Sequence, residues 1–198
     1  MTTSNRKGGF WMIVYIFFNP ALIGTIRQET SIAVSREAVD IDHITQRCPM
    51  LRSIAEEILR LTAYSASTRY ISSDTIIGGK TLRKGNRIMM PFRQIHRDMA
   101  IWGDKPQDFD PERFLKNPKL KRFNMAFGGG ATQCPGQHLA VYSMMLLAAI
   151  VVNKFDVQLD PPGQKFPEQD LGELVLGLAE VKKSMDVMVK LVPRNVQV

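Results

Sequence analysis

A single cysteine in a glycine-rich stretch constrains this chain more than any other feature. Cys134 stands in residues 127–136, directly before an apolar run over residues 139–152. Glycines let a backbone approach a flat ligand closely and adopt positive φ. A helix that begins after the loop directs its free N–H groups and the positive end of its dipole toward the sulfur, which favours a thiolate. The stretch therefore predicts a thiolate held against a buried metal, with a structural cysteine beside a helix cap as the alternative.

The spacing of four residues in this stretch resembles a known signature. Phe127, Gly130, Cys134 and Gly136 meet the pattern Phe-x-x-Gly-x-x-x-Cys-x-Gly, which is similar to the haem-ligand signature of the cytochrome P-450 superfamily, the haem-thiolate monooxygenases. The resemblance implies that Cys134 is the axial ligand of haem b and that Phe127 packs against the haem and shields the sulfur. It also implies that the two glycines shape the loop. A thiolate on haem iron favours cleavage of the O–O bond.

Two further motifs precede the cysteine in the order that the family has. Glu57 and Arg60 are three residues apart, which places them on one face of a helix. Alone, such a pair is usually a solvated surface pair. Residues 109–114, Phe-Asp-Pro-Glu-Arg-Phe, resemble the family's Pro-Glu-Arg-Phe segment, and the resemblance implies that Arg113 joins Glu57 and Arg60 in a buried network. The planar fork of arginine suits several fixed hydrogen bonds of this kind.

The remaining pattern predicts a mainly α fold with small β-hairpins, the C-terminal part of the cytochrome P-450 fold. A helix is expected from Cys48-Pro49, because apolar residues recur at helical spacing from Leu51 to Leu61. Residues 20–34 resemble the preceding helix. Residues 74–85 read as two strands around a tight turn at Gly78-Gly79. His96 is interpreted as a satisfied structural residue.

Length gives a further expectation. A cytochrome P-450 is more than twice as long as these 198 residues, so the chain resembles only the C-terminal portion of one such domain. Residues 1–47 would hold the end of the long helix that crosses the haem and the next helix. Residues 48–198 would hold the Glu-x-x-Arg helix, the hairpins, the cysteine loop, and the C-terminal helix and strands. The family's acid–alcohol pair has no match in residues 1–9. A truncated gene model, a degenerate copy and a partial chain remain alternatives.

The N-terminal region has a second interpretation. Arg6 and Lys7 precede the nine-residue apolar run 10–18, which resembles a secretory signal. The run is too short to span a membrane, and Asn19-Pro20 interrupts it, so a buried helix is favoured. The two cysteines form no disulfide framework; Cys48 is expected to be structural, and a free Cys134 suits a reducing compartment.

The distribution of charge in the sequence, and one departure from the family pattern, bear on which partners the protein binds. The net charge is +7, and the densest cationic cluster is Lys116, Lys119, Lys121 and Arg122. By resemblance, this side faces the acidic surface of an NADPH-dependent flavin reductase. No nucleic-acid motif accompanies the charge. Thr132 replaces the basic residue that usually pairs with a haem propionate.

The resemblance also bears on the rest of the site. Arg69 matches the family's other propionate-binding position. The amino-acid sequence of the cysteine loop resembles that of sterol 7-alpha-hydroxylases, prostacyclin synthase and their fungal relatives. Two segments resemble substrate-contact regions, residues 64–70 and 175–179, and their small apolar residues suit a lipophilic substrate.

These expectations converge on one function for the intact protein. It would be a haem-dependent monooxygenase of a small lipophilic, sterol- or terpenoid-like substrate at the cytosolic face of the endoplasmic reticulum membrane. Two alternatives remain open. The chain is a haem-binding remnant without turnover, or it is a membrane-tethered interaction protein with residues 10–18 as a short anchor.

Overall fold

The architecture is mainly helical, with small antiparallel sheets of two strands each. The computed structural model describes residues 3–172 and 177–194. The helices are α1 (Thr3–Phe17), α2 (Pro20–Thr30), α3 (Ile41–Arg47), α4 (Pro49–Thr62), α5 (Phe92–Ile95), α6 (Met99–Trp102), α7 (Arg113–Lys116) and α8 (Gln137–Lys154), with 3-10 turns at Ser31–Ala33, Pro118–Phe123 and Gly130–Thr132. The strands are β1 (Ala66–Tyr70), β2 (Thr75–Ile77), β3 (Lys80–Leu82), β4 (Arg87–Pro91), β5 (Phe155–Leu159), β6 (Gln169–Asp170), β7 (Glu180–Val181) and β8 (Val189–Pro193). The predicted mainly α class with small β-hairpins is confirmed.

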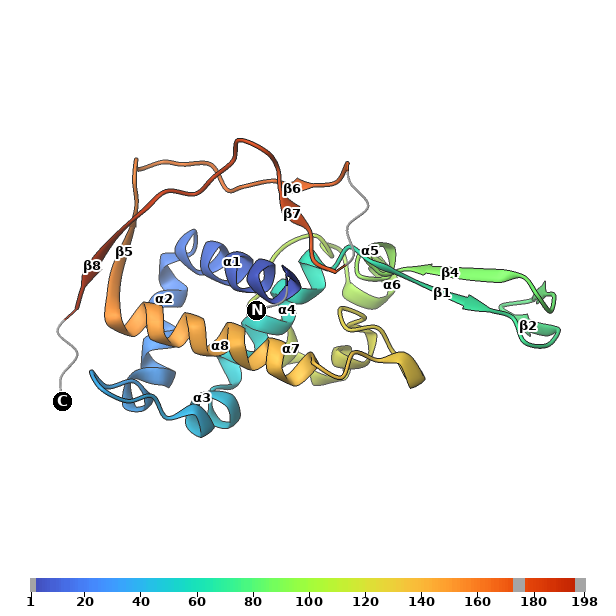
Figure 1. Ribbon diagram of the computed structural model, residues 1–198, viewed down its shortest axis with the longest axis horizontal. Coiled ribbons are helices and arrows are strands. Elements are labelled where there is room, and N and C mark those ends of the chain that lie inside the picture. The colour runs from blue at the N-terminus through green and yellow to red at the C-terminus, as the bar shows by residue number, and fades with distance from the viewer. Residues whose placement is uncertain (1–2, 173–176, 195–198) are drawn as a thin grey trace.

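The core lies where α1, α2, α4 and α8 meet. Helices α1 and α8 run side by side across α4 (Figure 1). Trp11, Met12 and Ile16 of α1 are fully buried against residues of α4 and α8 such as Ile58 and Met145. The apolar run 10–18 therefore packs as a core helix, as the favoured interpretation predicted. The helix is longer than that run, because it already begins at Thr3.

Helix α8 contains the predicted apolar run but does not bury all of it. The helix spans Gln137–Lys154 and buries its middle, including Met144 and Ala148. Leu139, expected inside a buried helix, is 70% exposed, because the first turn of α8 borders a cavity and not the helical core. That exposure locates the cavity at the N-terminal end of the helix.

Helix α4 begins at Pro49, as predicted, and is capped from another helix. The carboxylate of Glu29 in α2 accepts the N–H groups of Met50 at 2.9 Å and Leu51 at 3.0 Å. A negative side chain at this end also suits the helix dipole. Cys48 is buried before the first turn, and burial beside Glu29 raises the pKa of its thiol to about 11. Cys48 is thus the structural cysteine that was predicted.

The segment between α2 and α4 differs from the sequence prediction. One helix was expected over residues 20–34, but the α-helix ends at Thr30 and a 3-10 turn follows to Ala33. A short helix, α3, then precedes α4 and was not anticipated. The side chain of Asp40 starts it by accepting the N–H of His43 at 2.9 Å.

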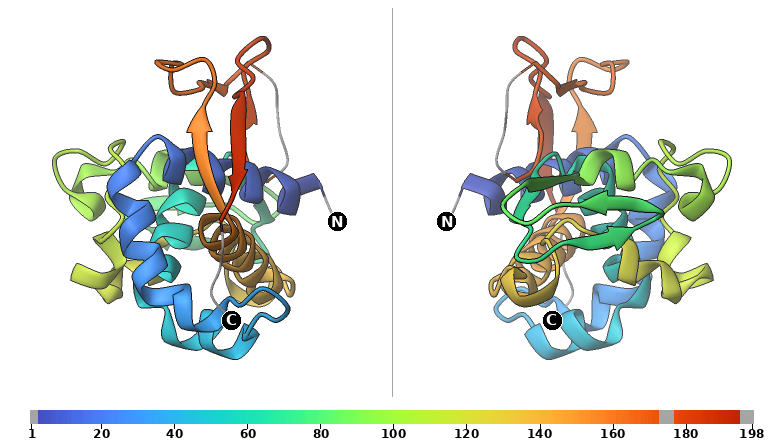
Figure 2. Two further views of the ribbon diagram at one scale, coloured as in Figure 1. Left: turned by 90° about the vertical axis from the view of Figure 1, so that its left-hand side faces the viewer. Right: turned by 90° about the vertical axis from the view of Figure 1, so that its right-hand side faces the viewer.

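Two consecutive strand pairs form an arm that projects from the helical core (Figure 1). Strands β2 and β3 pair around Gly78 and Gly79, which both have positive φ, so the predicted hairpin is confirmed. Strands β1 and β4 carry this hairpin outward. At the other end of the molecule, β5 and β8 rise from the end of α8, away from α3 (Figure 2).

The apolar helices also bear on membrane spanning. In the described parts of the chain no single helix has both the length and the apolarity to cross a membrane. The pair made of residues 4–17 and 20–33 reaches that threshold only jointly, with a bend of 111° between its halves.

Candidate functional site

A cavity of about 870 Å³ opens beside the cysteine loop. Segments from the whole chain meet there: the start of α1, the end of α4, strand β1, the cysteine loop, the first turns of α8 and residues 177–178. Most of its walls are apolar, and a few polar groups converge on it. The lining residues that matter below are Ser4, Asn5, Arg69, Phe127, Thr132 and Cys134. This combination is typical of a small-molecule or cofactor site.

The loop fixes Cys134 in the wall of the cavity. The N–H of Cys134 donates to the carbonyl of Phe127 at 2.9 Å, which closes the loop on itself. Gly130 lies within this closed turn at φ 66°, a conformation that residues with a Cβ adopt only with strain. Gly136 occupies the N-cap position of α8, and the Cys134 side chain is exposed toward the cavity. The predicted ligand cysteine and its glycines are therefore brought together at the start of α8.

Arg69 and Thr132 meet across the cavity wall. A guanidinium nitrogen of Arg69 donates to the hydroxyl of Thr132. The family resemblance implied that Arg69 binds a haem propionate and that Thr132 replaces the basic residue that usually binds the other. In the structure, β1 carries the Arg69 cation to the position beside Thr132. The cavity therefore keeps a positive charge close to the loop although the loop itself has lost its basic residue.

The structure brings Glu57, Arg60 and Arg113 together in one buried cluster. Arg60 donates to both oxygens of Glu57, at 2.8 and 2.7 Å, and Arg113 donates to Glu57 Oε1 at 2.9 Å. The side chains of Glu57 and Arg60 are fully buried. Arg60 also donates to two backbone carbonyls, those of His96 and Pro106, at 2.6 Å each. These contacts join α4 to the two segments on either side of α6.

His96 links this cluster to the cysteine loop. Its Nε2 atom accepts the N–H of Met125, two residues before Phe127, at 2.8 Å. Burial and the nearby charge of Arg60 lower the pKa of His96 to about 4, so its ring is neutral at pH 7 and able to accept. Nδ1 is buried with no hydrogen-bond partner in the described residues. His96 was predicted to be a satisfied structural residue; one of its two ring nitrogens is satisfied.

Comparison with known proteins places the chain in a family. The Cytochrome P-450 family model matches residues 2–185. The chain belongs to the cytochrome P-450 family. Proteins of this family are in general haem-thiolate monooxygenases.

Individual relatives are distant and longer. Bovine prostacyclin synthase is 29% identical over 93% of this chain and 42% of its own length. Cytochrome P-450 monooxygenase nodJ from Hypoxylon pulicicidum is 27% identical over 75% of the chain and 33% of its own length. Cytochrome P-450 734A1 from Arabidopsis thaliana is 30% identical over 84% and 32%. The chain therefore spans about a third to two fifths of the length of these three relatives.

The residues that line the cavity fit the prosthetic group of the cytochrome P-450 family. Apolar side chains such as Phe127, Leu139 and Leu178 suit the faces of a porphyrin. Cys134, unlike Cys48, is exposed to the cavity and offers a sulfur ligand. Arg69 offers a cation for a carboxylate. In the described ranges no cluster of three or more His, Cys, Asp or Glu residues forms a separate metal site.

Some site residues were missed by the sequence analysis. Ser4 and Asn5 were passed over because residues 1–9 contain no acid, yet both line the cavity from α1. The Oδ1 atom of Asn5 is buried without a hydrogen-bond partner among the described residues. Of the two expected substrate-contact segments, Ser65, Ala66, Ser67, Gly177 and Leu178 line the cavity. Val175 and Leu176 lie outside the described residues.

The cationic cluster is weaker than its sequence indicates. Lys116 pairs with Glu112 at 2.9 Å and with Asp110 at 3.6 Å. Lys121 pairs with Glu56 at 3.1 Å. Two of the four charges are therefore balanced locally, which the charge count could not reveal.

Proposed function

We propose that this chain forms the haem-thiolate part of a cytochrome P-450 monooxygenase, with Cys134 as the axial ligand of haem b. The observation that carries the proposal is the position of Cys134. It lies in the wall of a largely apolar cavity, in a loop closed by its own N–H, with the Arg69 cation in the same wall. A lone cysteine at a helix start is common, but a cysteine in an apolar cavity of this size with a cation beside it suits a flat acidic cofactor.

Each lining residue has a definite task in this proposal. Cys134 holds the iron, Phe127 packs against the ring beside the sulfur, and Gly130 and Gly136 give the loop its path. Arg69 holds a propionate, with Thr132 supporting the guanidinium. When bound, the haem supplies oxygen activation; the apolar walls exclude water from it. Ser4 and Asn5 place polar groups from α1 in a cavity that is otherwise mostly apolar.

Beneath the cavity, Glu57, Arg60 and Arg113 would act as a structural network that fixes the loop. The support is that Arg60 holds the carbonyl of His96, whose ring holds Met125 at the start of the loop. None of the three is proposed to touch substrate. Residues 1–47 would then be the end of the haem-crossing helix and the next helix, and residues 48–198 the rest of the C-terminal portion of one domain.

The proposed substrate is small and lipophilic, of sterol or terpenoid type. The walls contributed by Ala66, Leu178 and Met144 are apolar and would select against charged ligands. The branch is proposed from the sequence of the cysteine loop alone. The chain is similar to bovine prostacyclin synthase and to a fungal monooxygenase, and it is similar to plant enzymes at comparable identity.

An NADPH-dependent flavin reductase would supply electrons at the side of Lys116, Lys119, Lys121 and Arg122. Since Lys116 and Lys121 are balanced by carboxylates, Lys119 and Arg122 would carry most of the steering. For the intact protein the expected location is the cytosolic face of the endoplasmic reticulum membrane. No nucleic-acid partner is proposed.

A carbon-monoxide difference spectrum of the reduced, haemin-supplemented chain tests the assignment. The wild type should show the strongly red-shifted Soret band of a thiolate complex, and Cys134→Ala should lose it. Cys48→Ala is the matched control, because it removes the other cysteine from a buried site away from the cavity and should keep the band. A band that survives in Cys134→Ala would disprove the assignment.

The same protein distinguishes the remaining alternatives. A red-shifted band without reductase-dependent oxidation of any lipophilic substrate would favour a haem-binding remnant. The membrane-tether alternative is disfavoured by the packing of α1, since Trp11, Met12 and Ile16 are fully buried and leave little apolar surface for a bilayer.

A further inference from the structure

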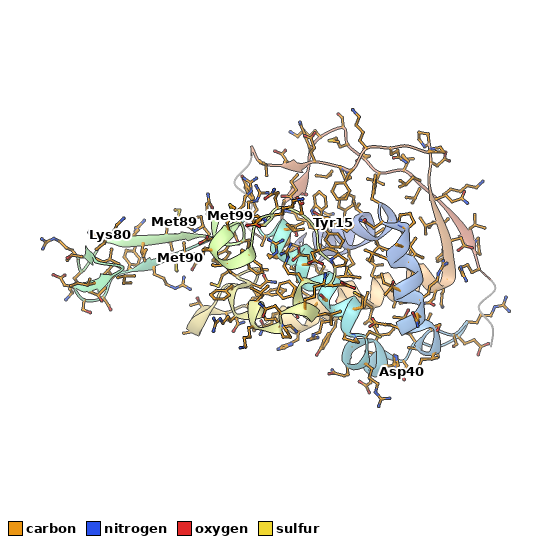
Figure 3. All side chains as sticks on the ribbon, turned by 180° about the vertical axis from the view of Figure 1, so that it is seen from behind. Tyr15, Asp40, Lys80, Met89, Met90 and Met99 are labelled. Carbon is orange, nitrogen blue, oxygen red and sulfur yellow. The ribbon has the colours of Figure 1, made fainter. Side chains whose placement is uncertain are left out.

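Two arginines near the end of α4, Arg93 and Arg97, form a pair of cations without an acidic partner. Arg93 belongs to α5, and Arg97 follows one helical turn later, so the two side chains emerge on the same side of this segment. Neither makes an ion pair with any residue that the structure describes. Met99, two residues after Arg97, lies at the base of the arm formed by β1–β4, far from Lys80 at its tip (Figure 3). The arginine pair therefore lies against the helical core and not on the projecting hairpin.

The guanidinium of Arg93 is held in place, but its N–H groups lack acceptors. It lies over the ring of Tyr64, two residues after the end of α4, with 5.3 Å between Cζ and the ring centroid. Its Nε atom is buried and has no hydrogen-bond partner among the described residues. A buried N–H of a charged group costs free energy when it has no acceptor, so such a group indicates a place for a water molecule or an ion.

Arg97 adds a second charge to the same place. Its side chain is open to solvent on one side. Partial desolvation, and then the charges of Arg93 and Arg60, lower the pKa of the Arg97 guanidinium. The three cations are therefore close enough to repel one another, and the repulsion is largest when no anion lies between them.

The carboxylates next to the arginine pair are already engaged elsewhere. Glu57 accepts hydrogen bonds from Arg60 at 2.7 Å and from Arg113 at 2.9 Å. Asp98 starts α6, because its carboxylate accepts the N–H of Ala100 at 2.9 Å. The charge of the arginine pair is thus not balanced by the described residues, and an anion from solution would relieve the repulsion.

We propose that the arginine pair binds a phosphate group, supplied either by inorganic phosphate or by a small phosphate monoester. Each guanidinium can donate two parallel N–H bonds to two oxygens of a phosphate. A phosphate monoester carries nearly two negative charges at neutral pH, which matches two cations, whereas a carboxylate has one charge and two oxygens. Side-on binding, with the guanidinium tilted on the Tyr64 ring, would give the Nε N–H of Arg93 its acceptor.

This phosphate site would lie outside the cavity that Cys134 borders. Neither arginine lines the cavity. Tyr64, which lies under Arg93, donates its N–H to the carbonyl of Gly177 at 2.9 Å, and Gly177 lines the cavity. The phosphate would therefore bind behind the cavity wall, and the inference does not depend on the proposed haem chemistry.

Isothermal titration calorimetry of the 198-residue chain with sodium phosphate tests the proposal, with the ionic strength held constant by sodium chloride. The wild type should bind phosphate, and acetate should bind much more weakly. The variant R93M/R97M removes both charges but keeps long side chains, and it should weaken phosphate binding by about tenfold or more. The matched control is R83M/R87M, which removes two exposed cations from the arm and should bind phosphate like the wild type.

Phenyl phosphate distinguishes the two sources of the phosphate group. If phenyl phosphate binds as tightly as inorganic phosphate, the site accepts a monoester; if only inorganic phosphate binds, the site takes the free ion.

Several results would overturn the proposal. They are a wild type that binds no phosphate, acetate that binds as tightly as phosphate, and an R93M/R97M variant that keeps the wild-type affinity. An equal loss of affinity in R83M/R87M would assign the binding to net charge and overturn it as well. Urea unfolding without phosphate verifies that the variants fold. If R93M/R97M is unstable, Arg97→Gln changes only the side chain that is open to solvent and should still weaken binding.

Discussion

The Nε2 atom of His96 accepts the backbone N–H of Met125 at 2.8 Å, and this bond joins the buried arginine cluster to the cysteine loop. The ring is fully inside the protein, packed edge-on against Trp102. Because Arg60 holds the carbonyl of the same histidine, α4 positions the loop through His96, and a second bond, from Asn124 Nδ2 to the carbonyl of Glu56 at 3.0 Å, adds a direct link.

Replacing His96 should therefore loosen the loop in a way that depends on hydrogen-bond acceptance. His96→Ala leaves the Met125 N–H buried without a partner and should lower the free energy of unfolding by about 2 kcal/mol or more. His96→Gln can place an amide oxygen near Nε2 and should recover part of the loss. Urea unfolding gives both values, and equal losses in the two variants would show that volume matters and the acceptor does not.

His96 also predicts a pH dependence of stability. Its pKa is about 4 in the folded protein and 6.5 when exposed, so the unfolded chain binds more protons between these values. Stability from this group is complete above pH 6.5 and declines as pH falls toward 4, by a total of ~3 kcal/mol. Urea unfolding between pH 7 and 4 should show a shallower slope for His96→Gln than for the wild type. Parallel slopes would mean that the ring does not stay neutral.

Breaking the Glu57 cluster should be far more damaging than breaking a surface pair. Glu57→Gln leaves Arg60, a fully buried cation, without its counter-ion and should cost about 3–5 kcal/mol. Glu112→Gln is the control, because Glu112 makes an exposed pair with Lys116 and should unfold at the wild-type midpoint. Thermal unfolding of the three proteins, side by side, measures the contrast. A small effect of Glu57→Gln would mean that the cluster is not required for folding.

Arg69 should govern cofactor affinity without governing the fold. Arg69→Ala removes the cation from the cavity and should weaken haemin binding about tenfold, the value of one charge-assisted hydrogen bond. Arg87→Ala removes a cation from β4, which pairs with the same strand, and should leave the affinity unchanged because Arg87 does not line the cavity. Haemin titration followed at the Soret band measures the affinity of both variants. If both lose affinity equally, the net positive charge of the protein sets the affinity and the position of Arg69 does not.

Local signals account for the parts of the fold that could be predicted. The hairpin at Gly78-Gly79 and the helix that begins at Pro49 both follow from residues within a few positions of each other. Spacing placed Glu57 and Arg60 on one helical face, and the motif resemblance linked them to Arg113. The three residues are indeed in contact.

Contacts between distant residues account for what could not be predicted. Glu29 caps a helix that begins 20 residues later, a role that no local pattern of acidic residues reveals. Because Thr132 stands where the family usually has a basic residue, the sequence predicted that the loop lacks a cation. In the structure, β1 places the Arg69 guanidinium against Thr132. The cluster from Lys116 to Arg122 looked like four free charges because the sequence does not show which carboxylates fold against them.

Helix α1 contacts residues 179–180, which lie near the other end of the sequence. Trp11 Nε1 donates to the carbonyl of Ala179 at 2.8 Å, and Lys7, almost fully buried, pairs with Glu180 at 2.7 Å. These contacts join residues that are far apart in the sequence. Such contacts form slowly, because the chain loses loop-closure entropy before the contacts can stabilise it. On the ribosome, α4 and α8 emerge earlier and can cover the apolar face of α1. Lys7 and the Trp11 ring nitrogen, however, gain these partners only after residues near 180 have emerged. Until then α1 is incompletely fixed, and the nascent chain benefits from a chaperone.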